Sequence, residues 1–273
     1  MEKVQKSARS YLFVPANRIE RFEKALNTKA DAIIIDLEDA VPVDLKISAR
    51  DELKTWLTDH PLENVMIRIN SKSSEWFVDD IQLTKFSNIR AIILPKTESV
   101  ADIDAVTALR AIDVFALIET PLGFANIRQI AQAKSVKALM FGSIDFQLEM
   151  NMQGGYEELL SFRNEFVLAS KLAGIESPVD GVTVDFKNKA LVERETLQAK
   201  QLGFAGKLCI HPNQVDIVNT AFTPTDAELT WAQRVLNAVN QTQGQAISLD
   251  GKMIDLPVIL RAQKILKQAN LNT

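Results

Sequence analysis

Eight short apolar segments recur along the chain, and their spacing is the feature that most restricts the possible folds. They begin at residues 11, 32, 65, 91, 114, 138, 181 and 207, with starts roughly 21 to 43 residues apart. This spacing is typical of βα units and is too long for hairpins. The segments are continuously apolar, as in "AIII" and "AIIL", which indicates parallel strands covered on both faces.

Helical patterns lie between these segments, so the sequence predicts a (β/α)8 TIM barrel over residues 9–222. A doubly wound open sheet is the competing fold, but it usually has a glycine-rich turn after its first strand. Here that turn reads "VPANRIERF", without G-x-G-x-x-G or a Walker loop. Residues 223–273 form a predicted C-terminal extension of two helices around a hairpin with an Asp-Gly turn. Because the barrel closes without it, the extension is free to pack on a neighbouring subunit or to cover the barrel mouth.

The composition restricts the partners of the protein. The chain has 47% hydrophobic and 24% charged residues and a formal net charge of −4, which argues against a general nucleic-acid surface. Its single cysteine, Cys209, excludes an intramolecular disulfide framework and suits a reducing compartment. Nowhere do 18 apolar residues occur in a row, so we expect no transmembrane helix and predict a soluble, cytoplasmic protein.

Polar side chains follow the predicted strands at the ends where TIM barrels carry their chemistry. This set comprises Arg18, Asp36, Glu38, Asp39, Arg68, Lys96, Glu98, Glu119, Asp145, Asp185 and His211. Glu119 and Asp145 follow consecutive strands, with no His or Cys cluster near them in the sequence. Two carboxylates with other positions left for water and substrate oxygens favour Mg²⁺, whereas zinc would need softer ligands.

Each of these residues also has a purely structural interpretation. Glu119 could favour the N-terminus of the next helix through its dipole, and Asp145 could cap a helix. Arg68 lies inside the apolar "MIRIN", where a charge is costly unless paired. It could form an ion pair with an acid at 36–39, clamp a carboxylate or oxyanion, or do both. The acids at 36–39 could orient Arg68 or bind backbone amides. For His211, which precedes Pro212, we expect a structural role.

Taken in order, several stretches resemble the citrate lyase β-subunit family, which includes malyl-CoA and citramalyl-CoA lyases. They are "RSYLFVPANRIERFEKAL", "ADAIIIDLEDAVPVDLKISAR", "IRIN", "ILPKTES", "ALIETPLG", "MFGSIDF", "GFAGKLCIHPNQV" and "DGKMIDLP". The resemblance implies a Mg²⁺-dependent barrel enzyme that cleaves a citryl-, malyl- or citramalyl-CoA type thioester. The implied products are acetyl-CoA or propionyl-CoA and an oxo acid.

The resemblance also implies roles for individual residues. Glu119 and Asp145 match metal ligands, and Arg68 matches the arginine beside the developing thioester enolate. Asp255 matches a catalytic acid/base that members of the family insert into the active site of a neighbouring subunit, which predicts an oligomer, specifically a trimer. The remaining candidates are Glu38 as a catalytic residue and Phe13, Arg18 and Lys24 for CoA.

Several alternatives stay open. Asp255 could instead be the N-cap of the last helix, which Pro257 at the next position but one supports. A class II aldolase acting on free hydroxy-oxo acids and an acyl-carrier-dependent citryl lyase subunit would both fit the same carboxylates. The loops "GSIDFQLEMNMQG" and "NSKSSEWFVDD" depart from the family pattern. The resemblance therefore predicts the type of reaction and leaves the acyl group and its enantiomer open.

Overall fold

The computed structural model describes residues 8–60, 65–241 and 247–272. These residues fall into two compact units, one that ends at Asn219 and one that begins at Thr220. Each unit has a hydrophobic core of its own.

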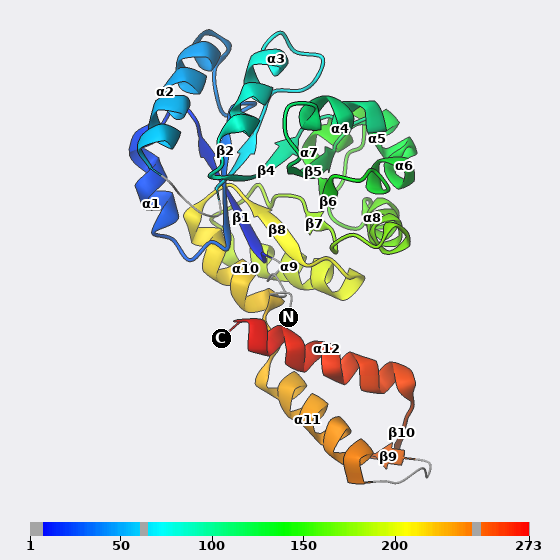
Figure 1. Ribbon diagram of the computed structural model, residues 1–273. Coiled ribbons are helices and arrows are strands. Elements are labelled where there is room, and N and C mark those ends of the chain that lie inside the picture. Colours follow the sequence, from blue (N-terminus) through cyan, green and yellow to red (C-terminus); the bar gives the residue numbers. More distant parts are fainter. Residues whose placement is uncertain (1–7, 61–64, 242–246, 273) are drawn as a thin grey trace. The chain divides into compact units, whose positions relative to one another are not determined.

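Eight parallel strands close into a barrel in the order in which they occur along the chain (Figure 1). They are β1 (Ser10–Pro15), β2 (Ala32–Asp36), β3 (Val65–Arg68), β4 (Ile89–Leu94), β5 (Asp113–Ile118), β6 (Val136–Phe141), β7 (Val179–Asp180) and β8 (Gly206–Cys209). β8 pairs with β1 from Ser10 opposite Lys207 to Leu12 opposite Cys209, and this pairing completes the ring. The predicted TIM barrel is confirmed.

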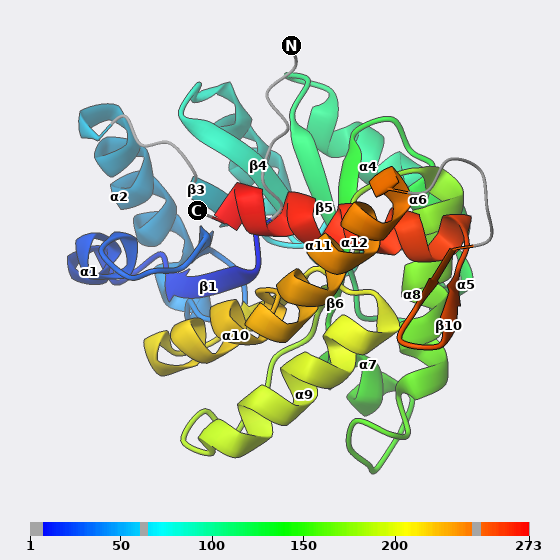
Figure 2. The same cartoon turned by 90° about the horizontal axis from the view of Figure 1, so that it is seen from below.

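Helices connect the strands and lie on the outside of the barrel, as α2, α8 and α9 show in both views (Figures 1 and 2). The α-helices up to Phe222 are α1 (Phe22–Leu26), α2 (Lys46–Asp59), α3 (Phe77–Asp80), α4 (Val100–Thr107), α5 (Pro121–Ala125), α6 (Ile127–Ala131), α7 (Ser143–Glu149), α8 (Leu160–Ala173), α9 (Lys189–Leu202) and α10 (Val215–Phe222). The 3-10 turns are η1 (Ile19–Arg21), η2 (Val43–Leu45), η3 (Ile81–Lys85) and η4 (Pro212–Gln214).

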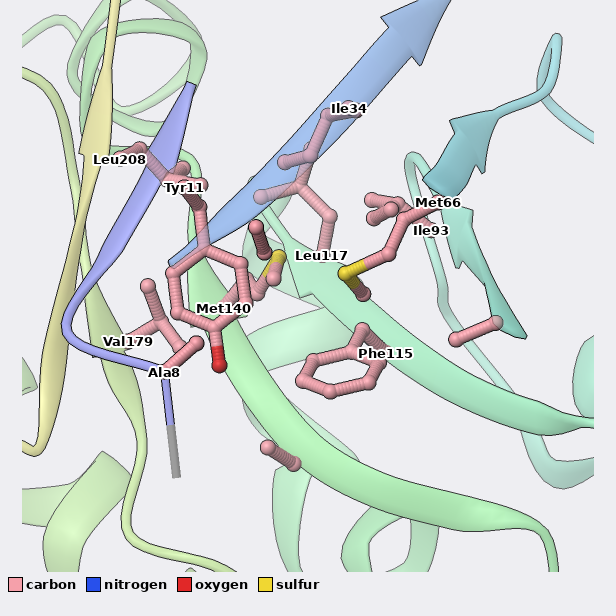
Figure 3. Packing of buried hydrophobic residues seen from close by; sticks show 13 residues of the cluster. Ala8, Tyr11, Ile34, Met66, Ile93, Phe115, Leu117, Met140, Val179 and Leu208 are labelled. Carbon is pink, nitrogen blue, oxygen red and sulfur yellow. The ribbon is translucent and has the colours of Figure 1, made fainter. Parts of the chain in front are cut away.

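The interior of the barrel is a packed apolar core, shown in Figure 3. Alternate strand residues such as Ile34, Met66, Phe115 and Leu208 point into it. Their neighbours along the strands are buried under the helices, and every residue of β2 is buried. Both faces of each strand are therefore covered, which explains why the strands read as continuous apolar segments.

The seventh strand begins earlier than predicted. The sequence indicated a strand from residue 181, but β7 comprises only Val179 and Asp180. A side chain on Gly181 would overlap Ser143 Oγ and the Phe141 carbonyl oxygen, so the chain there passes too close to its neighbour for anything but glycine. The alternating valines after it belong to a loop.

The C-terminal unit contains α11 (Asp226–Gln241), β9 (Ile247–Leu249), β10 (Lys252–Ile254) and α12 (Leu256–Asn272). The two strands pair antiparallel around Asp250 and Gly251, which both have positive φ, as a tight hairpin turn requires. Its core includes Ala232, Val235 and Ala262. Among the helices that the structure describes, none is long and apolar enough to cross a membrane.

Candidate active site at the barrel mouth

A cavity of about 360 Å³ opens at the carboxyl ends of the barrel strands. Most strands contribute to it, and it is lined by Phe13, Pro15, Asp36, Asp39, Ala40, Arg68, Leu117, Glu119, Phe141, Gly142, Ser143, Ile144, Asp145, Val182, Leu208 and Ile210. This is the end of a TIM barrel at which catalytic groups gather. Both predicted metal ligands and Arg68 are among the lining residues.

Glu119 follows the last residue of β5 and is only 2% exposed. The N-cap of α5 is Thr120, whose Oγ1 accepts the N–H of Gly123, so Glu119 is not needed as a cap. Glu119 Oε1 accepts the backbone N–H of Lys96 at 2.8 Å. Burial, together with the nearby carboxylate of Glu38, raises the pKa of Glu119 to about 8.

Gly142, directly after β6, makes room for this carboxylate. A Cβ on Gly142 would overlap both Cβ and Oε2 of Glu119, closer than real Cβ contacts allow. Asp145 lies in the first turn of α7 and is half-buried. It does not cap that helix, and it forms no hydrogen bond or ion pair with any residue that the structure describes. The carboxylates of Glu119 and Asp145 therefore line one cavity, and both interact electrostatically with Lys96.

This donor set fits a hard divalent cation. Within the described residues, no group of three or more His, Cys, Asp or Glu side chains is arranged to hold a metal ion. Mg²⁺ usually takes one or two protein carboxylates and fills its other positions with water and substrate oxygens. Burial raises the pKa of Glu119, and Gly142 leaves space beside this carboxylate. A cation bound in that space would favour the ionised form of Glu119.

Arg68, at the end of β3, is held by three carboxylates. Its Nε and Nη2 donate to Asp36 Oδ1 and Oδ2, both at 2.7 Å, as a bidentate pair. Its Nη1 lies 3.1 Å from Glu38 Oε2 and 3.4 Å from Asp39 Oδ2. The guanidinium also lies over the ring of Phe13, 4.8 Å from the centroid. The predicted ion pair is present, and the same side chain faces the cavity.

The family follows from comparison of the whole chain with known proteins. Residues 9–212 match the model of the HpcH/HpaI aldolase/citrate lyase family. The chain belongs to this family. Residues 158–272 also match a model of C–C bond lyases of the TIM-barrel fold. The predicted relationship to citrate lyase β-subunits is confirmed.

Members of the HpcH/HpaI family resemble the chain over nearly all its length. The (3S)-malyl-CoA thioesterase of Cereibacter sphaeroides is 34% identical over 269 residues, which cover 96% of this chain and 94% of that protein. The crystal structure of protein CitE from Mycobacterium tuberculosis in complex with magnesium, acetoacetate and coenzyme A is 31% identical. It has a TM-score of 0.86 and covers 97% of this chain and 100% of that one.

A citrate lyase beta subunit from M. tuberculosis, complexed with oxaloacetate and magnesium, is 30% identical with a TM-score of 0.72. That match covers 80% of this chain and 98% of the other. These relatives support the prediction of an enzyme of the carbon–carbon lyase class, and their bound magnesium and coenzyme A support the predicted cofactor and thioester.

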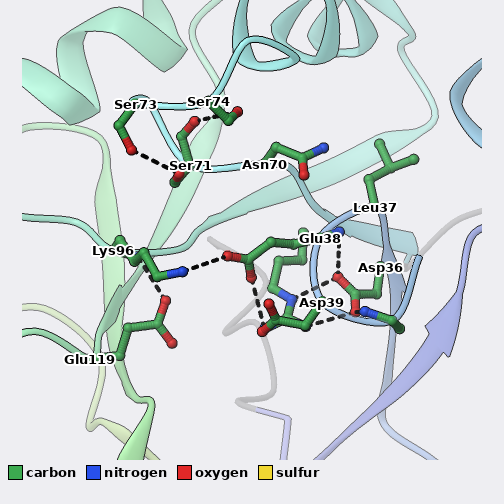
Figure 4. Close-up of polar contacts among 12 residues, drawn as sticks. Asp36, Leu37, Glu38, Asp39, Asn70, Ser71, Ser73, Ser74, Lys96 and Glu119 are labelled. Carbon is green, nitrogen blue, oxygen red and sulfur yellow. Dashed lines mark hydrogen bonds and ion pairs between the residues drawn. The ribbon is translucent and has the colours of Figure 1, made fainter. Parts of the chain in front are cut away.

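Glu38 lies between Arg68 and Lys96, and Figure 4 shows its side chain beside that of Lys96. Its Oε1 is 3.5 Å from Lys96 Nζ, and its Oε2 is buried beside Arg68 without a hydrogen-bond donor. Burial raises the pKa of Glu38 to about 7, with Asp39 adding to the shift and Arg68 opposing it. Such a pKa suits a group that exchanges protons near neutral pH. In Figure 4 the side chain of Lys96 extends toward Glu38, while Glu119 accepts the backbone N–H of Lys96.

Two lysines support these acids, and neither was among the predicted catalytic residues. Lys46, on α2, donates to the carbonyls of Leu37 and Glu38 and to Asn70 Oδ1, and so fixes the loop after β2. Lys96 has φ 46, an uncommon conformation for a residue other than glycine. This conformation accompanies the hydrogen bond from its N–H to Glu119. The strand-end position of Lys96 was the one sequence signal for its role.

The predicted CoA residues are separated in the structure. Phe13 lines the cavity beneath Arg68. Arg18 is exposed and pairs with Glu20 at 2.7 Å, and Lys24 is exposed on α1. Neither of these two basic residues lines the cavity.

Asp255 lies in the C-terminal unit, immediately before α12. Its Oδ1 accepts the N–H of Val258 at 3.2 Å, so the N-cap role is present. Its side chain is exposed. His211 is likewise the cap of η4, in accordance with its structural interpretation.

Proposed function

We propose that the chain is a Mg²⁺-dependent lyase that reversibly cleaves a citryl-, malyl- or citramalyl-CoA type thioester to acetyl-CoA or propionyl-CoA and an oxo acid. The observation that carries this proposal is the meeting of Glu119, Asp145 and Arg68 around one cavity. The bound CoA, oxo acids and magnesium of related structures support it.

The role of each of these residues follows from its charge. Glu119 and Asp145 hold the metal ion, which when bound acts as a Lewis acid and a template for the acid fragment. Arg68 presents positive charge where the thioester enolate develops, and its bidentate pair with Asp36 fixes the direction of its free N–H groups. Glu38, with its pKa near 7, balances the charge of Arg68 and accepts the proton that the substrate hydroxyl loses when the C–C bond breaks.

Asp255 supplies the proton that the enolate carbon takes up, and it does so from a neighbouring copy of the chain, with residues 223–273 as the contributing segment. Its exposure supports this role, because a buried cap could not reach another subunit. The proposal includes a homotrimer. Subunit mixing tests it: refolded mixtures of Asp255→Asn and Glu119→Gln chains should regain about one quarter of the activity, since that share of sites combines two intact residues. No recovery would refute a shared site.

CoA binds through Phe13, Arg18 and Lys24, with the two exposed cations meeting its phosphates. Replacement of Arg18 and Lys24 by alanine should raise KM for the thioester and leave kcat nearly unchanged. A class II aldolase that acts on free hydroxy-oxo acids would not respond to this change.

The experiment that tests the function is product detection with citryl-, malyl-, methylmalyl- and citramalyl-CoA, in Mg²⁺ and in EDTA. Glu119→Gln is the isosteric control, because it keeps an acceptor for the Lys96 N–H and removes the charge. Release of acyl-CoA and oxo acid that needs both Mg²⁺ and Glu119 would support the lyase.

Free thiol should be measured in the same reactions. The relative named (3S)-malyl-CoA thioesterase makes hydrolysis a second candidate activity, which releases CoA without oxo acid. If no product forms from any of these thioesters although CoA still binds, the result would instead favour a subunit that acts on an acyl carrier protein.

A further inference from the structure

One buried lysine joins the chain segments that follow two neighbouring strands. Lys46, the first residue of α2, is only 6% exposed. Its ammonium donates to the carbonyl oxygens of Leu37 at 2.8 Å and Glu38 at 2.7 Å, and to Asn70 Oδ1 at 2.8 Å. Glu38 lies on the segment after β2 and Asn70 on the segment after β3 (Figure 4), and these strands are paired. All three N–H groups of the ammonium are therefore used to hold the two segments together.

Asn70 is itself held by α2 and α3. Its backbone N–H and its Nδ2 donate to Asp80 Oδ2 at 2.9 and 2.7 Å, and Asp80 Oδ1 accepts from Arg50 Nη1 at 2.9 Å. All of these side chains are buried. Because both N–H groups face Asp80, the amide orientation of Asn70 is fixed and its Oδ1 is directed to Lys46. Asp80, Asn70 and Lys46 thus form a buried relay of hydrogen bonds that ends at the backbone of Glu38.

The Glu38 carboxylate depends on its backbone for its position. Among the described residues, no donor forms a hydrogen bond with its Oε2, and its ion pairs with Arg68 and Lys96 are 3.1 and 3.5 Å long. The backbone, by contrast, is fixed on both sides. The N–H of Glu38 donates to Asp36 Oδ1 at 2.9 Å, and its carbonyl oxygen accepts from Lys46. Since Asp36 Oδ1 also accepts from Arg68 Nε, Asp36 and Lys46 together fix Glu38 relative to Arg68.

The charge of Lys46 is expensive for a purely structural role. Its three acceptors are all neutral oxygens. Burial lowers the pKa of Lys46, and the carboxylates of Asp36 and Glu38 only partly oppose this shift. A neutral side chain of similar volume would avoid the cost of burying an ammonium. The position that Lys46 gives to Glu38 explains why a charged side chain is used there.

We infer that Lys46 is a positioning residue, and that the relay of Asp80, Asn70 and Lys46 holds the Glu38 carboxylate where it accepts the proton of the substrate hydroxyl. This inference rests on the proposed lyase function and deepens it. Because all three of its N–H groups are used, Lys46 has none left for the substrate and acts through Glu38.

The first test separates positioning from stability. Lys46→Met keeps a side chain of similar size without the donors. Leu53→Ala is the matched control, because Leu53 is fully buried on the same helix and has no part in the relay. With Mg²⁺ and the thioester that the wild type cleaves, Lys46→Met should lower kcat by about 10- to 100-fold and change KM by less than about threefold. Leu53→Ala should lower the melting temperature and leave kcat unchanged. Wild-type kcat in Lys46→Met, or an equal loss in both variants, would overturn the inference.

A double-mutant cycle tests whether Lys46 acts through Glu38. In a Glu38→Gln background, Lys46→Met should lower kcat by less than about twofold, because the carboxylate that it positions is already gone. If the two losses multiply, Lys46 does not act through Glu38 and the inference is wrong.

If the wild type cleaves none of the thioesters, the proposed lyase function fails, and the pKa of Glu38 decides the inference without any activity. It is measured by NMR of protein with ¹³C-labelled glutamate, and Glu38→Gln identifies the signal. Burial raises this pKa to about 7. Loss of positioning in Lys46→Met should let the carboxyl reach water, so its pKa should fall toward the ordinary Glu value. Asp36, Asp39, Arg68 and Lys96, the charged groups around this carboxyl, are retained in Lys46→Met. Loss of the Lys46 charge alone would raise the pKa, so a raised or unchanged pKa overturns the inference.

Asn70→Ala is the second variant, and it decides the inference if Lys46→Met does not fold. It removes one acceptor of Lys46 and leaves the bonds to both carbonyls in place. The relay predicts smaller effects in the same direction, with kcat lowered by about 3- to 10-fold and a lower pKa of Glu38. A folded Asn70→Ala protein with the wild-type kcat and the wild-type pKa of Glu38 would overturn the inference.

Discussion

Replacement of Gly142 by alanine tests whether the position of the Glu119 carboxylate controls the chemistry. The backbone of Gly142 has φ −82 and ψ 69, so alanine adds no requirement for a left-handed conformation. The new Cβ would, however, overlap Cβ and Oε2 of Glu119. Ordinary contact between such atoms needs about 3.5 Å, so the carboxylate and the backbone that carries the Glu119 Cβ must both move by about 1 Å.

A displacement of this size should be costly for catalysis and should also lower stability. A 1 Å misplacement of a reacting or binding group can cost about 100-fold in rate, which corresponds to about 2.7 kcal/mol of transition-state free energy. We expect Gly142→Ala to lower kcat/KM by about this factor and to weaken Mg²⁺ binding. The melting temperature should fall as well, because the Glu119 Cβ moves only with the backbone that follows β5.

The assay is kcat/KM as a function of Mg²⁺ concentration, with melting curves for every variant. Gly155→Ala is the matched control, since a Cβ there meets only Glu158 Oε2 at 4.0 Å. In a Glu119→Gly background, Gly142→Ala should add no further loss, because glycine at 119 removes both atoms that the new Cβ would overlap. Wild-type activity and metal affinity in Gly142→Ala, or full additivity of the two changes, would refute the reasoning.

Three further predictions follow from the charged residues. Arg68→Lys keeps the positive charge but cannot form the bidentate pair, so kcat should fall at least about 100-fold while thermal unfolding shows a folded barrel. Burial raises the pKa of Glu119 to about 8 in the folded protein. Ionisation of this carboxyl should therefore lower the free energy of unfolding as pH rises from the pKa of Glu119 in the unfolded chain toward 8. Without metal, Glu119→Gln should therefore be more stable by roughly 3 kcal/mol at pH 7 in denaturant unfolding, and a less stable variant would contradict this. Burial opposes ionisation of Asp180, but the charges of Lys207 and Arg163 outweigh burial and hold the pKa of Asp180 below the usual range. The stabilising charge of Asp180 is therefore present above the ordinary Asp pKa and is lost on acidification. Melting temperatures between about pH 3 and 6 should fall with pH in the wild type and less steeply in Asp180→Asn, which is already destabilised at pH 7 because it lacks the buried carboxylate that pairs with Lys207 and Arg163.

The barrel and the meeting of the two metal-binding candidates could be predicted because both follow from local patterns and one topological rule. Strands such as β2 and β5 are apolar on both faces, so they are visible as continuous segments. The carboxyl ends of barrel strands share one mouth, so Glu119 and Asp145 were expected together, and they line the same cavity. The seventh strand was misplaced because the valines after Gly181 alternate as in a strand, while the close backbone approach there has no sequence signal.

The charge network outside the barrel could not be predicted. Asp180 on β7 accepts from Arg163 on α8 at 2.8 Å and from Lys207 on β8 at 3.1 Å. These residues are 17 and 27 positions from Asp180, and no local pattern joins them. Sequence reasoning that looked only at strand ends passed over Lys207, because its side chain points from the middle of β8 toward the helices. The left-handed backbone of Lys96 is equally invisible, since the residue type does not favour it.

The mouth contains more negative charge than the fold needs, and this surplus is best understood as a consequence of function. Arg68 requires one carboxylate for pairing, yet three surround it, and Glu119 is buried beside them with its pKa raised. Uncompensated buried carboxylates cost stability, so a chain selected for stability alone would replace Glu119 with a neutral residue. A divalent cation reverses that cost because it supplies the missing charge at the point where Gly142 leaves space.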